Sequence, residues 1–134
     1  MSMLDAGKAY FFSPLSMKIY RDGEPVVGAK VVRRWEHSTL EQDESITDGE
    51  GKVSFPEVRR RTVVQVLPAE FVVAQQIAVI VDGDEIEVWS NSKRDSAKNS
   101  ELGGKPLNLY CDLNNEEKLY RDFGSAFFTK CTWE

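Results

Sequence analysis

Hydrophobic and polar residues alternate along most of this chain, the pattern of β-strands that bury one face. The clearest example is LNLYCDL, residues 107–113. Alternation places one set on a buried face (Leu107, Leu109, Cys111 and Leu113) and the other on an exposed face (Asn108, Tyr110 and Asp112). This periodicity predicts strands, not helices, as the main element of the fold.

The segment 77–88 predicts a β-hairpin, because Asp82-Gly83-Asp84 supplies a turn between two alternating runs. Further strands are expected near residues 15–20, 28–36, 52–56 and 61–67, and a late strand within 124–133. The stretch KRDSAKNSELGG, residues 93–104, is the one helical candidate, with Asp95 or Ser96 as its N-cap and Gly103 as its stop.

Length and charge narrow the class of protein. The chain has 134 residues, which predicts a single domain over residues 1–134, with a loose N-terminal segment 1–13. The net charge of -5 gives no electrostatic reason to bind nucleic acid or an anionic membrane. No apolar run is long enough to cross a bilayer, and residues 1–20 lack a signal-peptide pattern. We therefore expect a cytoplasmic protein, or a periplasmic one if a signal peptide has been removed.

The two cysteines, Cys111 and Cys131, could form one bridge, but a cytosolic chain of this size would keep them reduced. We expect two free thiols. Neither lies in a C-x-x-C pair or a zinc-binding pattern, so no metal and no cofactor is predicted.

Two motifs occupy residues 23–55. The first is G-x-P-V-x-G-A-x-V, which includes Gly28, Ala29 and Val31, and the second is T-D-x-x-G-x-x-x-F, which runs from Thr47 to Phe55. In the second, the Asp48 side chain can cap a turn, Gly51 can adopt a positive φ, and the strand that follows enters the core.

This pair of motifs resembles the transthyretin-like, or carboxypeptidase regulatory-like, β-sandwich family. The resemblance implies an all-β, transthyretin-like (Ig-like) sandwich of about seven or eight strands, with at most one short helix. The rest of the chain resembles small bacterial proteins, some of which accompany secreted toxins or secretion-system components. Neither resemblance transfers a catalytic residue, because YRDFGS at 120–125 is only distantly similar to the Tyr-Arg-Gly-Ser signature of the hydrolase branch.

The sequence offers little for catalysis. His37 is the sole histidine, and no nucleophile motif such as G-x-S-x-G accompanies it. The acidic stretch 41–50, EQDESITDGE, lacks the spacing of a calcium loop. It is interpreted as a solvated acidic loop outside the core, which could also dock a basic partner. We predict that the chain is not an enzyme; an enzyme would have to combine His37 with Cys131 or with arginines.

The binding residues we predict are acidic, basic and aromatic: Asp43 and Glu44 in the acidic stretch, Arg59 and Arg60 in the basic run, and Trp89. Trp89 is out of phase with Ile86 and Val88, so an exposed position and a covered one remain equally open. The favoured function is a non-enzymatic protein-binding module, an immunity or accessory protein for a secreted bacterial toxin. Its partner would be another protein, a toxin or secretion-system component. A structural component of a secretion assembly or a carbohydrate-binding module is the alternative, and the oligomeric state is open.

Overall fold

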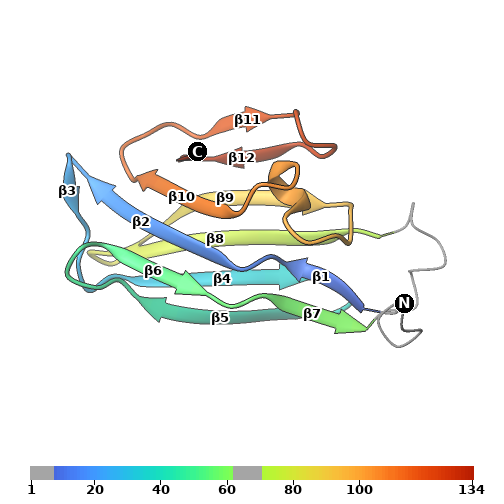
Figure 1. The fold of residues 1–134 in the computed structure, drawn as a ribbon. Helices are drawn as coiled ribbons and strands as arrows, with labels where there is room; N and C mark the ends of the chain where they lie inside the picture. Colours follow the sequence, from blue (N-terminus) through green and yellow to red (C-terminus); the bar gives the residue numbers. More distant parts are fainter. Residues whose placement is uncertain (1–7, 62–70) are drawn as a thin grey trace.

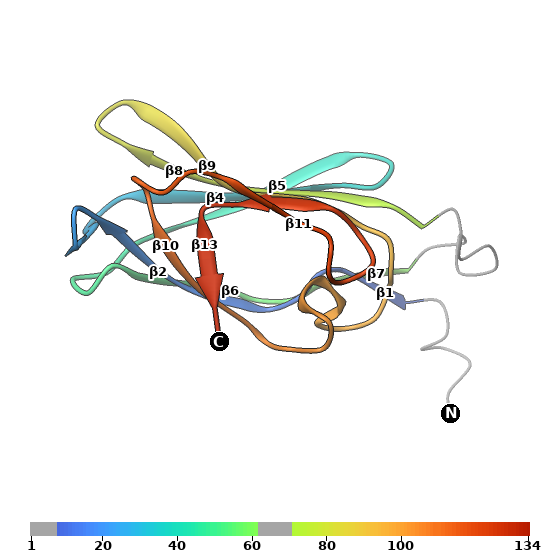
Figure 2. The same ribbon diagram turned by 90° about the horizontal axis from the view of Figure 1, so that it is seen from above.

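The computed structural model describes residues 8–61 and 71–134, which form an all-β sandwich of two facing layers (Figures 1 and 2). These residues form thirteen strands, more than the seven or eight expected. One reason is that Pro14 and Pro56 lie in breaks between consecutive strands. A proline cannot donate to the hydrogen-bond ladder, so it interrupts a sheet.

The first layer is a six-stranded sheet in the order β11-β12-β9-β8-β4-β5, in which every neighbouring pair is antiparallel. Its strands are β11 (Lys118–Tyr120), β12 (Phe127–Thr129), β9 (Asp84–Lys93), β8 (Val73–Val81), β4 (Lys30–Glu36) and β5 (Leu40–Ile46). The expected hairpin is β8 and β9, with its turn at 82–83.

The second layer has the order β13-β10-β2-β3, and β6 also pairs with β2. A separate pair, β1-β7, lies at one end of it (Figure 1). Its strands are β13 (Cys131–Trp133), β10 (Leu107–Asp112), β2 (Leu15–Arg21), β3 (Glu24–Pro25), β6 (Lys52–Phe55), β1 (Lys8–Phe12) and β7 (Val58–Arg61). β10 and β2 are parallel, and the other pairs are antiparallel.

The core lies between the layers and is filled by alternate residues of the strands. The predicted register of β10 is confirmed: Leu107, Leu109 and Cys111 are buried, whereas Asn108 and Tyr110 are exposed. Leu113 is also buried, and Asp112 is half-buried.

Trp89 is fully buried, so the alternative of an exposed tryptophan is excluded. The cause is an irregularity in the β8-β9 ladder, where Ile77 pairs with Trp89 but the next residue, Ala78, pairs with Glu87. Val88 is therefore the extra residue of a β-bulge, and the inward-facing phase shifts by one position along β9. Val88 and Trp89 are both buried as a result.

The two sequence motifs contact each other directly. The backbone N–H of Ala29 donates to Thr47 Oγ1 at 2.9 Å, and Thr47 N–H donates to the Ala29 carbonyl at 2.9 Å. Asp48 Oδ1 accepts from the backbone N–H groups of Glu50 and Lys52, each at 2.9 Å, and Gly51 has a φ of 76°. These contacts confirm the predicted turn.

Several sequence predictions are wrong, and one concerns residues outside 8–61 and 71–134. Residues 41–46 of the supposed acidic loop belong to β5, and residues 8–12 of the supposed loose segment form β1, in which Ala9, Phe11 and Phe12 are buried. The predicted strand 61–67 lies outside the described residues except for Arg61. The helical candidate reduces to a 3-10 helix, η4 (Ser100–Leu102), with Asn99 at its N-cap and Gly103 ending it as expected.

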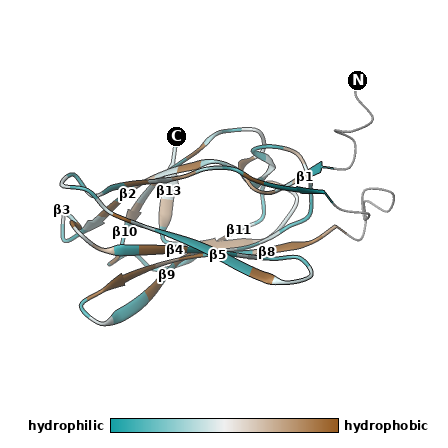
Figure 3. Cartoon of the chain, turned by 90° about the horizontal axis from the view of Figure 1, so that it is seen from below, coloured by the Kyte–Doolittle hydropathy of each residue, from teal (hydrophilic) through white to brown (hydrophobic). Residues whose placement is uncertain are grey.

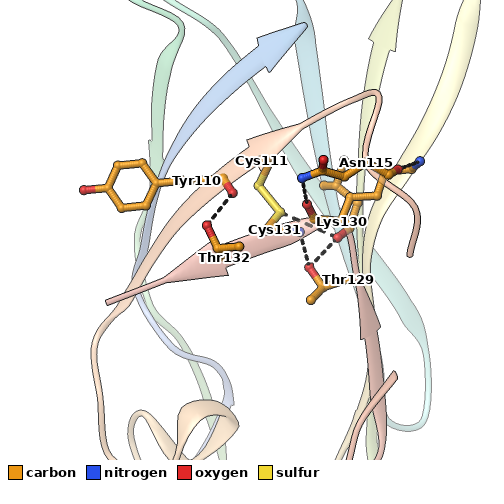
Figure 4. The surroundings of a disulfide bond; sticks show 8 residues. Tyr110, Cys111, Asn115, Thr129, Lys130, Cys131 and Thr132 are labelled. Atoms are coloured by element: carbon orange, nitrogen blue, oxygen red, sulfur yellow. Dashed lines mark hydrogen bonds between the residues drawn. A yellow bond between two sulfur atoms is a disulfide. The ribbon is translucent and has the colours of Figure 1, made fainter. Parts of the chain in front are cut away.

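The expectation of two free thiols is also wrong, because Cys111 and Cys131 form a disulfide (Figure 4). The antiparallel pairing of β10 with β13 places these residues directly opposite each other, with Cα atoms 4.0 Å apart. This pairing between the two strands could not be deduced from the cysteine spacing.

Candidate protein-binding edge

The strand β5 is the last strand of the six-stranded sheet, and it carries the acidic residues singled out in the sequence. One side of β5 pairs with β4 over seven residue pairs. Within residues 8–61 and 71–134, no strand pairs with its other side. We call Leu40–Ile46, with this open side, the β5 edge; it is mostly hydrophilic in Figure 3.

Side chains of the β5 edge alternate between the two faces of the sheet. Leu40, Gln42, Glu44 and Ile46 are exposed, and the residues between them are half-buried. Leu40 and Ile46 are 63% and 57% exposed. The exposed row thus has an apolar residue at each end and polar residues in the middle.

Asp43 points inward and holds the guanidinium of Arg33. The bond between Arg33 Nε and Asp43 Oδ1 is 3.0 Å long, and that between Nη2 and Oδ2 is 2.6 Å. Arg33 is fully buried on the inner face of the sheet, which it shares with Val31 and Trp35. Asp43 is consequently a structural partner of Arg33, and its side chain is 33% exposed.

Glu41 connects the edge to the second layer. Its carboxylate accepts from Arg60 Nη2 at 3.3 Å and from Trp35 Nε1 at 3.3 Å. Arg59 lies with its guanidinium 5.0 Å from the centre of the Tyr10 ring and 3.8 Å from Glu57. The fold therefore brings Arg60 of the basic run into contact with the acidic strand, whereas the contacts of Arg59 are with Tyr10 and Glu57.

Glu44 is the acidic residue of the edge that faces solvent. Its one ion pair among the described residues is with Lys30, at 3.8 Å, and both side chains are about half exposed. An exposed pair at this distance contributes little. Glu44 therefore keeps a carboxylate that an approaching cation can reach.

Of the five predicted binding residues, Trp89 does not belong to a surface, since it is fully buried against Phe127 and donates its Nε1 hydrogen to Gln75. The sequence reasoning missed Leu40 and Ile46. The signal that predicts them is the period-two spacing of LEQDESI, which puts Leu40 and Ile46 on the same face as Gln42 and Glu44.

Among the described residues, the arrangement most similar to a catalytic pair of nucleophile and base is Ser100 with Lys93, whose side chains are hydrogen-bonded. Lys93 is buried, and burial lowers the pKa of its ammonium group. However, its Nζ donates to the carbonyls of Asp95 and Ala97 and to Ser100 Oγ, and it lies 3.8 Å from Glu101. A nitrogen that donates to three oxygens has no lone pair to accept a proton from serine, so this cluster anchors a loop.

The ring of His37 lies between the backbone and two aromatic side chains. His37 Nδ1 lies 3.1 Å from the Val72 carbonyl, and its ring contacts Phe11 and Phe71. In the part of the chain that the structure describes, no group of three His, Cys, Asp or Glu residues is arranged to hold a metal ion. In the same part, no helix is long and apolar enough to span a membrane.

Comparison with known proteins adds a family assignment. The profile described as Domain of unknown function (DUF6795) matches residues 15–116, from the start of β2 to beyond the end of β10. The chain belongs to this family. A search among curated proteins gave no match. The DUF6795 region contains the whole β5 edge and Arg59 and Arg60, but not β11, β12 or β13.

Proposed function

We propose that this DUF6795 chain is a non-enzymatic protein-binding domain that holds an extended, basic segment of another protein along the β5 edge. The observation that carries the proposal is the open side of this seven-residue edge strand, with exposed Leu40 and Ile46 at its ends. An added strand would satisfy the free backbone groups, while alternate side chains would contact the exposed row.

Charge selects the partner. Glu44 presents a half-exposed carboxylate between the two aliphatic residues, and its 3.8 Å pair with the exposed Lys30 is weak, so a strand with a Lys or Arg opposite it is favoured. Antiparallel pairing with a second copy, centred on Asp43, would place Gln42 opposite Glu44 and supply no cation to it, whereas a basic segment supplies one. The occupant is therefore a different protein.

The resemblance to proteins that accompany secreted toxins suggests the class of this partner: a toxin or a secretion-system component. The disulfide between Cys111 and Cys131 also supports a role outside the cytosol. Disulfides persist in oxidising compartments and are rare in the cytosol. We therefore include a periplasmic or extracellular location in the proposal, in place of the cytoplasmic one expected from the sequence.

Site-specific photo-crosslinking in the native cell tests the proposal. A photoreactive residue at Gln42, on the exposed row, is expected to capture one partner, whereas the same residue at Glu116, exposed in the loop between β10 and β11, is not. The captured protein is then purified, and its association is measured at several salt concentrations.

Two variants test the contacts with that partner. Glu44→Lys is expected to slow association at low salt, with a smaller effect at high salt. Leu40→Ser is expected to speed dissociation by about tenfold, because an aliphatic contact is lost. Glu116→Lys and Leu119→Ser are the matched controls, since Leu119 is a 41% exposed residue on the opposite edge strand, β11. Equal effects of the variants and their controls would contradict binding at the β5 edge.

A further inference from the structure

The outer face of the second layer carries a hollow of about 360 Å³, formed by β2, β6 and β10. It lies on the other layer from the β5 edge. The strand register brings small polar residues together there, because Ser16 lies opposite both Ser54 and Asn108. This row leaves room above the sheet that longer side chains would fill. The hollow has the volume of a small-molecule site, whose range begins at about 300 Å³.

Two lysines border the hollow. Lys18 of β2 and Lys52 of β6 are directly opposite each other on neighbouring antiparallel strands and point to the same face. Like charges in this arrangement are destabilising. Glu50 compensates Lys52, whose Nζ lies 2.9 Å from the Glu50 carboxylate. No carboxylate within the described ranges forms an ion pair with Lys18, so its ammonium is available to an anion.

Tyr110 is the aromatic residue of the hollow. It lies opposite Lys18 on β10 and is 37% exposed, although its strand neighbours Leu109 and Cys111 are buried. Asp48 also lines the hollow, but its Oδ1 is occupied by two backbone N–H groups, which hold the pKa of that carboxyl below its usual value. The site thus offers an aromatic ring, hydroxyl and amide groups, and the ammonium group of Lys18, which has no ion pair among the described residues, in a lining that also holds the ionised Asp48.

We infer that this hollow binds an acidic saccharide, a sugar chain with a carboxylate or sulfate group. A sugar ring packs on Tyr110, its hydroxyl groups exchange hydrogen bonds with Ser16, Ser54 and Asn108, and Lys18 pairs with the acidic group. The ring and the polar floor distinguish this ligand from a bare inorganic anion, which needs only the lysine. The inference does not depend on the β5 edge.

Binding of defined oligosaccharides to the full chain tests this inference by calorimetry and by chemical-shift changes. The probes are tetragalacturonate, a sulfated tetrasaccharide, neutral maltotetraose and inorganic phosphate. We expect saturable binding of one or both acidic tetrasaccharides, with shifts confined to β2, β6 and β10. Binding of maltotetraose with equal strength, binding of phosphate alone, or no binding of any probe would overturn the inference.

Variants of the outward-facing residues locate the site. Lys18→Gln is expected to weaken binding by about tenfold through loss of a charge-assisted bond, and Tyr110→Ala by a similar factor. Lys98→Gln is the matched control, because it removes the same charge from an exposed loop residue. Lys18→Gln should also leave the fold intact and raise the melting temperature slightly, since it relieves the repulsion with Lys52. Equal affinity of Lys18→Gln and the unaltered chain would exclude this site.

Discussion

The guanidinium of Arg33, completely buried, forms two parallel hydrogen bonds with the carboxylate of Asp43 on the neighbouring strand. Its third contact is the carbonyl of Pro56, which accepts from Nη1 at 2.7 Å. Three aromatic rings surround the same group, with centres 5.0–5.2 Å from its central carbon. This cluster joins β4 and β5 to the segment after β6, and so links the two layers beside the β5 edge.

Replacement of Asp43 by Asn is expected to lower the free energy of unfolding by about 2–3 kcal/mol, because it leaves a buried arginine without its counter-charge. Asp43 is 33% exposed, so the loss is smaller than the about 3–5 kcal/mol typical of breaking a fully buried ion pair. The control Glu44→Gln breaks only an exposed pair and should cost under about 1 kcal/mol. Urea unfolding of both variants measures the difference. An unchanged midpoint for Asp43→Asn would mean that Arg33 is not buried as described.

Gly51 and Gly49 provide a matched pair within one turn. A Cβ at Gly51 would lie 2.7 Å from the Ile19 carbonyl oxygen, and the residue has a positive φ, whereas nothing lies within 4 Å of a Cβ at Gly49. Gly51→Ala is therefore expected to cost about 2 kcal/mol or more, and Gly49→Ala close to nothing. Thermal unfolding separates the two variants. Similar melting temperatures would contradict the turn geometry.

The disulfide is expected to stabilise the fold by about 3 kcal/mol, the value for a closed loop whose ends are 20 residues apart in sequence. Unfolding with and without reductant measures this, and Cys111→Ala/Cys131→Ala serves as a variant that reductant cannot affect further. Equal stability of the unaltered protein in both conditions would show that the thiols are free.

The carboxyl group of Glu117 predicts a pH dependence. Burial, followed by the negative charge of Glu87, raises the pKa of Glu117 above its ordinary 4.5. Between 4.5 and this raised pKa the folded state binds more protons than the unfolded state, so stability decreases as pH rises. Glu117→Gln should remove this loss and raise stability at pH 7 by about half a kcal/mol or less, with no gain at pH 4. Melting curves at both pH values test it, and an equal gain at both would contradict the proton linkage.

Local features of the chain were predictable from the sequence because they depend on neighbouring residues. The alternation in residues 107–113 specified which face of β10 is buried, since successive side chains of a strand point to opposite faces. Asp48 and Gly51 specified a turn, because the capping oxygen and the positive φ are both supplied within five residues. The all-β class followed from the same periodicity.

The candidate sites were only partly predictable, because their contacts come from strands distant in sequence. The charge of Asp43 and Glu44 was visible, but only the pairing of β4 with β5 decided that one holds Arg33 and the other faces solvent. The bulge opposite Ile77 buried Trp89, and the register of β2 with β6 and β10 set Lys18 beside Lys52 and Tyr110. The alternation along a strand determines which face each residue occupies. The partner of a residue depends on which strands become neighbours, and packing of the whole core decides which strands do so.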